Sequence, residues 1–219
     1  MFMPKNEFFQ AYEEKLKESL NQFLPGERAQ SKMAPLHRHP KKITHHTKKA
    51  GVLLLLYPKD TEVYTVFIKR QVYEGVHSGQ ISLPGGKMEK TDNTIIDTAL
   101  RETREEIGIN PKHIKIIGKL TELFIPVSDY IVQPVIGTLH YEPEYSPDPR
   151  EVDDIFSVPL KKLTDPVCVS TNQTFTENNK KYTAPFYKVD NLQIWGATAM
   201  ILSEFMELYE KTIKQTLKK

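Results

Sequence analysis

A glycine pair followed by a helix-forming stretch that ends in three glutamates is the feature that most constrains this chain. The pair is Gly85-Gly86, and the stretch runs to Ile109. On a helix that advances about 100° per residue, Glu102 and Glu106 lie one turn apart on one face, with Glu105 beside them. A separate apolar stripe contains Ile96, Leu100, Thr103 and Ile107. The helix is therefore expected to pack one face on a core and to gather carboxylates on another.

Carboxylates at this spacing repel one another. Each like-charged pair costs about 0.2–0.5 kcal/mol on an isolated helix, so the helix alone gains nothing from the arrangement. A solvated acidic face is one interpretation of a Glu-x-x-Glu-Glu pattern. The other is a metal site, because hard cations such as Mg²⁺ or Mn²⁺ bind several carboxylate oxygens together with substrate phosphate oxygens. The motif around the glutamates favours the metal site.

The segment from Gly86 to Ile109 resembles the Nudix box. Residues 101–109 match the second half of that motif at every fixed position except Thr103. The first half departs from it, because Asp92 stands where the motif has glutamate and one extra residue separates Asp92 from Arg101. The departure leaves the glycine turn and the three glutamates unchanged.

The run from Arg70 to Gly86 extends the resemblance upstream. It is similar to the signature of coenzyme A diphosphatases, in which an arginine precedes a Gly-Gln-x-x-Phe-Pro-Gly-Gly block, and that subfamily usually has the longer box with aspartate. Two positions differ, since Gly75 replaces a second arginine and Leu83 replaces the aromatic residue. These differences concern the substrate more than the chemistry.

The resemblance implies a metal-dependent hydrolase that cleaves the diphosphate linkage of coenzyme A or its derivatives to 3',5'-ADP and 4'-phosphopantetheine. An alternative is a Nudix diphosphatase acting on ADP-ribose, a dinucleotide or a damaged nucleotide. A third possibility is a non-catalytic Nudix module that binds a nucleotide or a protein, against which the three intact glutamates argue. A homodimer is also expected from the resemblance.

Roles for individual residues follow from the same resemblance. Glu102 and Glu106 are expected to be the principal metal ligands, together with the carbonyl of Gly86, and Glu105 is expected to share a second ion or to order bound water. The expected ion is Mg²⁺ or Mn²⁺. Arg101 is expected to support catalysis by bracing the glutamates through ion pairs. Substrate-binding candidates are Arg70, Gly79, Gln80 and Lys87. For Gln80, a hydrogen bond that stabilises its own loop is an equal alternative.

The general base is expected outside the box. Glu151 follows a proline-rich loop at a suitable place in the order of elements, and Glu105 and Asp129 are its rivals. A solvated loop position is the alternative for Glu151. Trp195, before the last helix, is interpreted as a core anchor.

Composition favours one domain with additions. The 219 residues are 39% hydrophobic and 26% charged, enough for one sizeable core. A net charge of +2 does not indicate nucleic acid as the partner, so a small-molecule substrate is expected. Cys168 is the only cysteine, which excludes an internal disulfide, and it is interpreted as a core residue. The chain shows neither a secretory signal nor an apolar run long enough for a bilayer, so the cytoplasm is expected.

The pattern predicts an α/β protein with a mixed sheet between helices and an N-terminal helical extension. The resemblance implies that this fold is a Nudix α/β/α sandwich. Residues 1–50 form the extension and residues 51–219 the hydrolase domain. The stretch 34–49 lacks acidic residues and predicts an exposed basic loop, either a solvated linker or a site for polyanionic substrate.

Helices are predicted at 7–24, 94–107 and 197–217. The apolar stripe of the first is expected to contain Phe8, Tyr12, Leu16, Leu20 and Phe23. The second is expected to be capped by Asp92 or Thr94 and to end at Gly108. Strands are predicted at 52–57, 63–70, 114–123, 131–140, 154–158, 167–176 and 181–189.

Overall fold

The computed structural model describes residues 5–36, 42–74, 77–165, 169–177 and 180–217. Its main element is an eight-stranded mixed sheet in which β1 is central, parallel to β7 and antiparallel to β2. The short strand β4 also pairs with β1, β5 and β6 pair with β7, and β3 and β8 pair with β2. The bounds are β1 Lys48–Lys59, β2 Glu62–Arg70, β3 Ile81–Ser82, β4 Gly85–Lys87, β5 Lys115–Lys119, β6 Leu123–Ile125, β7 Tyr130–Thr138 and β8 Val152–Pro159.

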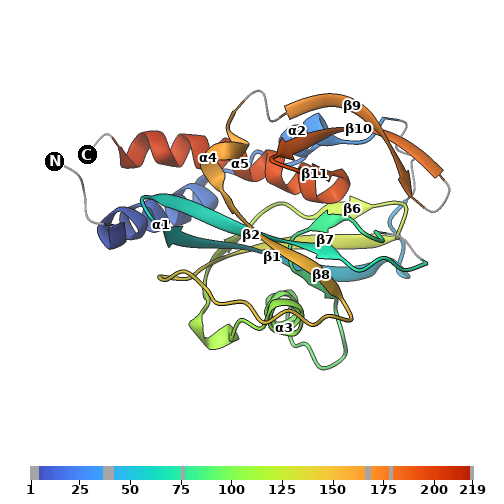
Figure 1. Cartoon of the computed structure of the whole chain (residues 1–219), viewed down its shortest axis with the longest axis horizontal. Helices are drawn as coiled ribbons and strands as arrows, with labels where there is room; N and C mark the ends of the chain where they lie inside the picture. The colour runs from blue at the N-terminus through green and yellow to red at the C-terminus, as the bar shows by residue number, and fades with distance from the viewer. Residues whose placement is uncertain (1–4, 37–41, 75–76, 166–168, 178–179, 218–219) are drawn as a thin grey trace.

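Helices cover both faces of this sheet. Helix α3 (Ile95–Ile107) lies on one face, and α1 (Lys5–Gln22) and α5 (Gly196–Thr216) lie on the other (Figure 1). The apolar run of β1 explains both layers, because side chains alternate along a strand. Leu54 and Leu56 join the core under α1 and α5, whereas Leu53 and Leu55 join the core under α3. The predicted α/β/α sandwich with a mixed sheet is confirmed.

Helix α3 packs unusually close to β1, and this fixes the height of its carboxylates above the sheet. A Cβ atom at Gly51 would lie 2.6 Å from the Ile95 carbonyl oxygen and 3.1 Å from the Ala99 nitrogen. Any larger residue at this position of β1 would push the helix outward. Ala99 and Ile107 are fully buried against the strand.

The first helix belongs to the larger core. Tyr12 and Leu16 of α1 are fully buried, and α1 packs against α5. The predicted apolar stripe was wrong at one end, because Phe23 lies beyond the helix and is 67% exposed, while Phe9 is buried. The division of the chain at residue 50 remains a proposal.

A second, three-stranded antiparallel sheet lies beside α5. It consists of β9 (Val169–Glu177), β10 (Lys180–Val189) and β11 (Leu192–Trp195), of which the sequence predicted the hairpin but not β11. Trp195 is partly buried and stacks on Phe175 with 4.4 Å between ring centroids, so it anchors this sheet rather than the main core. Cys168 lies outside the described residues.

The strand predicted at 114–123 is two strands, β5 and β6, that pair with different parts of β7. Between them, the Thr121 backbone N–H donates to Glu204 of α5 at 3.2 Å, which draws the chain out of the sheet. Short helices complete the fold: α2 (Glu27–Gln30), η1 (Ser31–Met33), η2 (Pro111–His113) and α4 (Leu160–Leu163). Within the described ranges, no helix is both long and apolar enough to cross a bilayer.

The basic stretch 34–49 is only partly a loop. Its last two residues, Lys48 and Lys49, begin β1, and the Lys48 ammonium lies 5.6 Å from the Tyr130 ring centroid. Lys42, His45 and His46 are exposed, as the prediction of an exposed basic segment requires. Residues 37–41, which include Arg38 and Lys41, lie outside the described residues.

Candidate active site

Helix α3 carries the predicted glutamates and is capped at both ends. The Thr94 hydroxyl accepts from the Asp97 N–H at 3.2 Å, and the Asp97 carboxylate accepts from the Thr94 N–H at 2.8 Å, which forms a capping box. Gly108 ends the helix in the left-handed conformation with φ 77°. Of the two predicted caps, Thr94 is the one observed, and Asp92 has a different partner.

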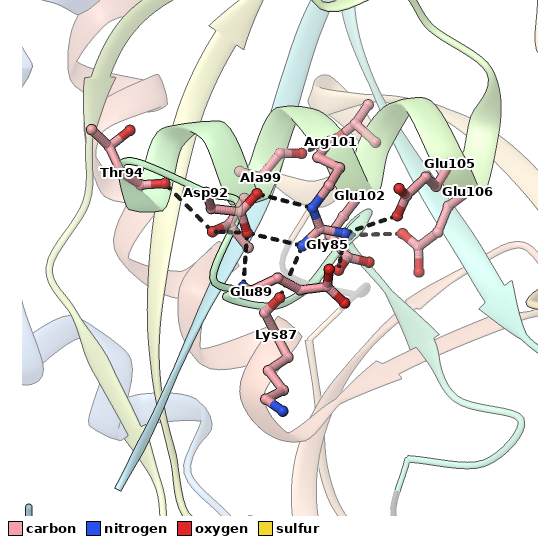
Figure 2. Close-up of polar contacts among 12 residues, drawn as sticks. Gly85, Lys87, Glu89, Asp92, Thr94, Ala99, Arg101, Glu102, Glu105 and Glu106 are labelled. Carbon is pink, nitrogen blue, oxygen red and sulfur yellow. Dashed lines mark hydrogen bonds and ion pairs between the residues drawn. The ribbon is translucent and has the colours of Figure 1, made fainter.

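That partner is Arg101, which ties the glycine turn to the helix (Figure 2). Its Nε donates to Asp92 at 3.0 Å, and its Nη2 donates to the Lys87 carbonyl at 3.0 Å. Its Nη1 donates to both Glu102 and Glu105 at 2.8 Å. The Arg101 hydrogen bonds hold the pKa of Asp92 well below its usual range. These contacts are those that a bracing role for Arg101 requires.

The glycine pair brings the backbone of β4 directly under the glutamates. The Gly85 N–H donates to Glu106 Oε2 at 2.8 Å. A Cβ atom at Gly86 would lie 2.5 Å from the Glu102 carboxyl carbon, and one at Gly85, where φ is +147°, would lie 2.4 Å from the Gly51 carbonyl oxygen. Glycine is therefore required at both positions, because the space of a side chain is taken by the Glu102 carboxylate and by β1.

Three carboxylates converge at this turn. Glu102, Glu106 and Glu151, called the carboxylate group below, each offer an oxygen within 4.8 Å of the others. Glu106 has no exposed surface, and burial raises its pKa to about 8, helped by the nearby Glu102 and Glu151 and opposed by Arg70 and the Gly85 N–H. Burial also raises the pKa of Glu102. Among the described residues, Arg70 pairs with Glu106 at 3.3 Å and Arg101 pairs with Glu102 at 2.8 Å, and Arg101 is shared with Asp92 and Glu105. The negative charge of the three carboxylates is therefore only partly balanced.

Glu151 reaches the group because its loop is hydrogen-bonded to the end of α3. The Asp148 N–H donates to the carbonyl of Glu106 at 3.2 Å, and the Asp148 carbonyl accepts from the Glu151 N–H at 3.1 Å. One residue thus links the backbones of two members of the group. Gln71 holds the loop from the other side, because its N–H donates to the Glu151 carbonyl and its Nε2 donates to the Pro149 carbonyl, both at 3.0 Å.

The sequence predicted a base or a solvated loop position for Glu151, and it gave no indication of Gln71 or Asp148. No local signal identifies them, because their contacts join segments far apart in the chain. Glu105 was expected among the metal ligands, but its half-exposed side chain is paired with Arg101 and lies outside the carboxylate group. Asp129, a rival for the base, lies in the turn before β7 and accepts from the Thr47 hydroxyl at 3.2 Å, also outside that group.

Of the four substrate-binding candidates, one contacts the carboxylate group and the other three have different surroundings. Arg70 lies at the group through its ion pair with Glu106. The Lys87 side chain points away from the glutamates (Figure 2). Gln80 Oε1 lies 3.2 Å from His77 Nδ1, a contact within its own loop, and the Gly79 N–H donates to the Gln71 carbonyl at 3.2 Å. For Gln80, this contact matches the loop-stabilising alternative.

The donor set fits a hard divalent cation. All three side chains of the carboxylate group offer oxygen, as Mg²⁺ and Mn²⁺ prefer, and a cation would offset the repulsion and burial that raise the pKa of Glu106. A cleft of about 430 Å³ opens beside the group between residues 70–73 and 149–151. The arrangement can hold a cation next to a space that admits a small molecule.

Comparisons with known proteins agree on the family. The family model of the NUDIX domain matches residues 47–182. An uncharacterized Nudix hydrolase, NudL, of Pectobacterium atrosepticum is 32% identical over 167 residues, which cover 73% of this chain and 82% of that protein. Mitochondrial coenzyme A diphosphatase NUDT8 of Homo sapiens is 32% identical over 139 residues, which cover 61% of this chain and 57% of that protein.

Among solved structures, the MutT/nudix family protein from Enterococcus faecalis matches with a TM-score of 0.50 and 16% identity. The match covers 100% of this chain and 82% of that chain. At this identity the likeness shows the fold alone.

Proposed function

Because the chain belongs to the Nudix family of hydrolases, we propose that it cleaves the diphosphate linkage of coenzyme A or its derivatives and yields 3',5'-ADP and 4'-phosphopantetheine. The observation that carries the proposal is the carboxylate group, which combines three carboxylates with an adjoining cleft. The run from Arg70 to Gly86 and the similarity to a coenzyme A diphosphatase support the choice of substrate.

Glu102, Glu106 and the carbonyl of Gly86 would hold Mg²⁺ or Mn²⁺, and Glu105 would join a second ion or order water beside it. When bound, the cation neutralises charge on the diphosphate and on the attacking group. Arg101 keeps the glutamates in place through its ion pairs. Arg70, at the border between the carboxylate group and the cleft, would bind a phosphate oxygen.

Glu151 is our proposed proton acceptor. Water attacks one phosphorus atom, the bond from that phosphorus to the bridging oxygen breaks, and the water proton passes to the Glu151 carboxylate. Its position in the carboxylate group also allows it to ligate the cation. Glu151→Gln separates the two roles. If Glu151 is the base, the variant has a lower kcat and its pH profile lacks one ionisation, while its metal affinity is unchanged. If Glu151 is a ligand, the variant binds the metal more weakly.

A substrate panel with identification of products by mass tests the proposal. Coenzyme A should be cleaved with a higher kcat/KM than ADP-ribose or NADH, and thorough chelation should abolish turnover until Mg²⁺ or Mn²⁺ is restored. Faster cleavage of ADP-ribose would favour the second candidate, a diphosphatase for another nucleotide, to which Gly75 in place of arginine points. Turnover that survives chelation would remove the metal from the proposal.

The 3'-phosphate of coenzyme A is proposed to meet the basic stretch 34–49. Dephospho-coenzyme A lacks this phosphate, so it should be cleaved with a kcat/KM at least about tenfold lower than that of coenzyme A, because a charged hydrogen bond is worth about 1.5–3 kcal/mol. A homodimer and a cytoplasmic location are further proposals; the first rests on the family resemblance. Sedimentation and cell fractionation test them.

A further inference from the structure

Glu151 differs from the other two members of the carboxylate group in how it is held. Glu102 and Glu106 project from α3, a helix that is capped at both ends and packed closely on β1. Glu151 is an exposed residue of the loop before β8. Because packing does not fix an exposed side chain, its place in the group depends on the backbone of this loop.

Main-chain hydrogen bonds attach the first part of the loop to α3. The Ser146 N–H donates to the Ile107 carbonyl at 3.0 Å. The Asp148 N–H donates to the Glu106 carbonyl at 3.2 Å. Both carbonyls belong to the last turn of the helix, where acceptors lack partners within the helix itself. These bonds hold the segment before Glu151 rather than the backbone on either side of it.

That backbone is held by a single residue of the opposite segment, Gln71. Its N–H donates to the Glu151 carbonyl at 3.0 Å. Its side-chain Nε2 lies 3.0 Å from the Pro149 carbonyl oxygen and 3.5 Å from the Val152 carbonyl oxygen. The amide carries two hydrogens, so it can donate to both carbonyls together. One residue thus contacts three of the four carbonyls in residues 149–152.

Gln71 is in turn placed by the main sheet. It follows Arg70, the last residue of β2, which pairs with Glu106 at 3.3 Å. The Gln71 carbonyl accepts from the Gly79 N–H at 3.2 Å, and its side chain is partly buried. The side-chain amide therefore ties the Glu151 loop to the end of a strand.

The Asp148 carboxylate acts on the same loop in a different way. It accepts from the N–H and the Nε of Arg150 at 2.9 Å and 3.0 Å, so this contact joins residues that are two apart in the chain. A contact within a loop stabilises the shape of that loop. The Gln71 amide instead determines where the loop lies relative to β2.

We propose that Gln71 is a positioning residue for the reaction, because its side-chain amide holds Glu151 in the carboxylate group. The inference rests on the proposed function in taking Glu151 to act in hydrolysis, either as base or as ligand. A proton acceptor must lie within hydrogen-bond reach of the attacking water. A displacement of about 1 Å can lower the rate by about a hundredfold.

A double-mutant cycle on the full chain at saturating Mn²⁺ tests the role of Gln71 in turnover. Gln71→Met keeps the length of the side chain and removes its donor, so kcat should fall by about tenfold or more while KM stays within about twofold. The pH profile of kcat should change as it does in Glu151→Gln. The double variant should have the kcat of Glu151→Gln alone, because displacing a group that no longer acts costs nothing further. Two effects that multiply would overturn the proposal.

Hydrogen exchange measures the loop directly and requires no turnover. Gln71→Met should speed exchange of the Asp148 and Glu151 amide hydrogens by about tenfold or more, because the segment that carries them loses its attachment to β2. Gln71→Glu also removes the donor and should have the same effect. It replaces Gln71→Met if circular dichroism shows that the methionine variant does not fold. Unchanged exchange at both amides would overturn the proposal.

Gln30 provides a matched control. Its Nε2 also donates to the carbonyl of a connection between strands, that of Thr121 at 3.1 Å, and to Glu204 of α5 at 2.9 Å. Gln30→Met should lower the unfolding temperature but leave kcat, its pH profile and the exchange at Glu151 unchanged. A merely structural role for Gln71 predicts this same pattern in Gln71→Met, which would overturn the proposal.

The kinetic measurements use the diphosphate that is cleaved fastest in the substrate panel, so a failure of the coenzyme A assignment leaves them valid. Unchanged kcat and metal affinity in Glu151→Gln would overturn the role of Glu151 in the proposed function, and the positioning role of Gln71 with it. An effect of Glu151→Gln without any effect of Gln71→Met would overturn the positioning role alone.

Discussion

Two fully buried glutamates lie on opposite sides of the main sheet, and their surroundings differ in kind. Glu204, on α5, accepts hydrogen bonds from the Gly26 N–H at 3.1 Å and from Gln30 Nε2 at 2.9 Å. It also accepts from the N–H and the hydroxyl of Thr121, at 3.2 Å and 2.7 Å. Four donors surround one carboxylate, and they join α2, the β5–β6 connection and α5.

Glu106, on α3, is equally buried but has fewer partners. It accepts from Gly85 and Arg70, and it lies in a group with two other carboxylates. Burial, together with the neighbouring Glu102 and Glu151, raises its pKa to about 8. A buried carboxylate that is rich in donors stabilises the fold, whereas one that is short of donors and crowded by like charges is stabilised by a bound cation or by a proton. On this difference we assign Glu204 a structural role and propose a functional one for Glu106.

The largest expected effect is on catalysis. Glu106→Gln should lower kcat by about a thousandfold or more at saturating metal, because a neutral amide replaces a charged ligand at the ion that stabilises the transition state. Thermal unfolding of the metal-free variant at pH 8 should occur at or above the wild-type temperature, because repulsion within the group is relieved. Near wild-type kcat would place Glu106 outside the reaction.

The same substitution at the structural site should do the reverse. Glu204→Gln turns one acceptor into a donor beside the Gln30 amide, which should lower the free energy of unfolding by about 1–3 kcal/mol. Well below the unfolding temperature, kcat and metal affinity should stay within about twofold of wild type. Denaturant unfolding and Mn²⁺ titration measure the two quantities. A loss of metal affinity without a loss of stability would contradict the comparison.

The pH dependence of metal-free stability should also distinguish the two sites. The pKa of Glu106 is near 8 in the folded state and about 4.5 in the unfolded chain, so the folded state binds the extra proton between these values. Stability from this group is therefore full below about pH 4.5 and is lost as pH rises through about 8. The slope should approach about 1.4 kcal/mol per pH unit. Denaturant titrations from pH 5 to 8, in wild type and Glu106→Gln, measure this slope. An equal slope in both proteins would mean that the pH dependence comes from a group other than Glu106.

The smallest effect is expected at Glu105, which is half-exposed and already paired with Arg101. Glu105→Gln should lower kcat/KM by about tenfold or less, because an exposed pair contributes little and the carboxylate group stays intact. Glu151→Gln is the matched comparison and should cost more. If Glu105→Gln lost as much activity as Glu106→Gln, Glu105 would be a principal ligand, and the carboxylate group would not define the metal site.

The sequence by itself determined the features that depend on neighbours in the chain. The spacing of Glu102 and Glu106, the cap at Gly108 and the apolar run of β1 are set within a few residues. Periodicity predicts the glutamate face and the strand, and the conformational preference of glycine predicts the cap. The helix α3, the central strands and the Nudix resemblance followed from such patterns. For the N-cap of α3 the sequence left two candidates, Asp92 and Thr94, because both side chains can accept a hydrogen bond from the first N–H groups of a helix.

The tertiary structure alone decided which segments meet. Glu151 lies beside Glu106 because the Asp148 N–H donates to the Glu106 carbonyl at the end of α3. Glu105 lies outside the carboxylate group and is paired with Arg101. Glu204 interrupts the strand predicted at 114–123 by accepting from Thr121. These outcomes depend on backbone donors and acceptors brought together from distant parts of the chain. Hydrogen bonds of this kind depend on three-dimensional position and carry no periodicity, so a sequence pattern does not reveal them.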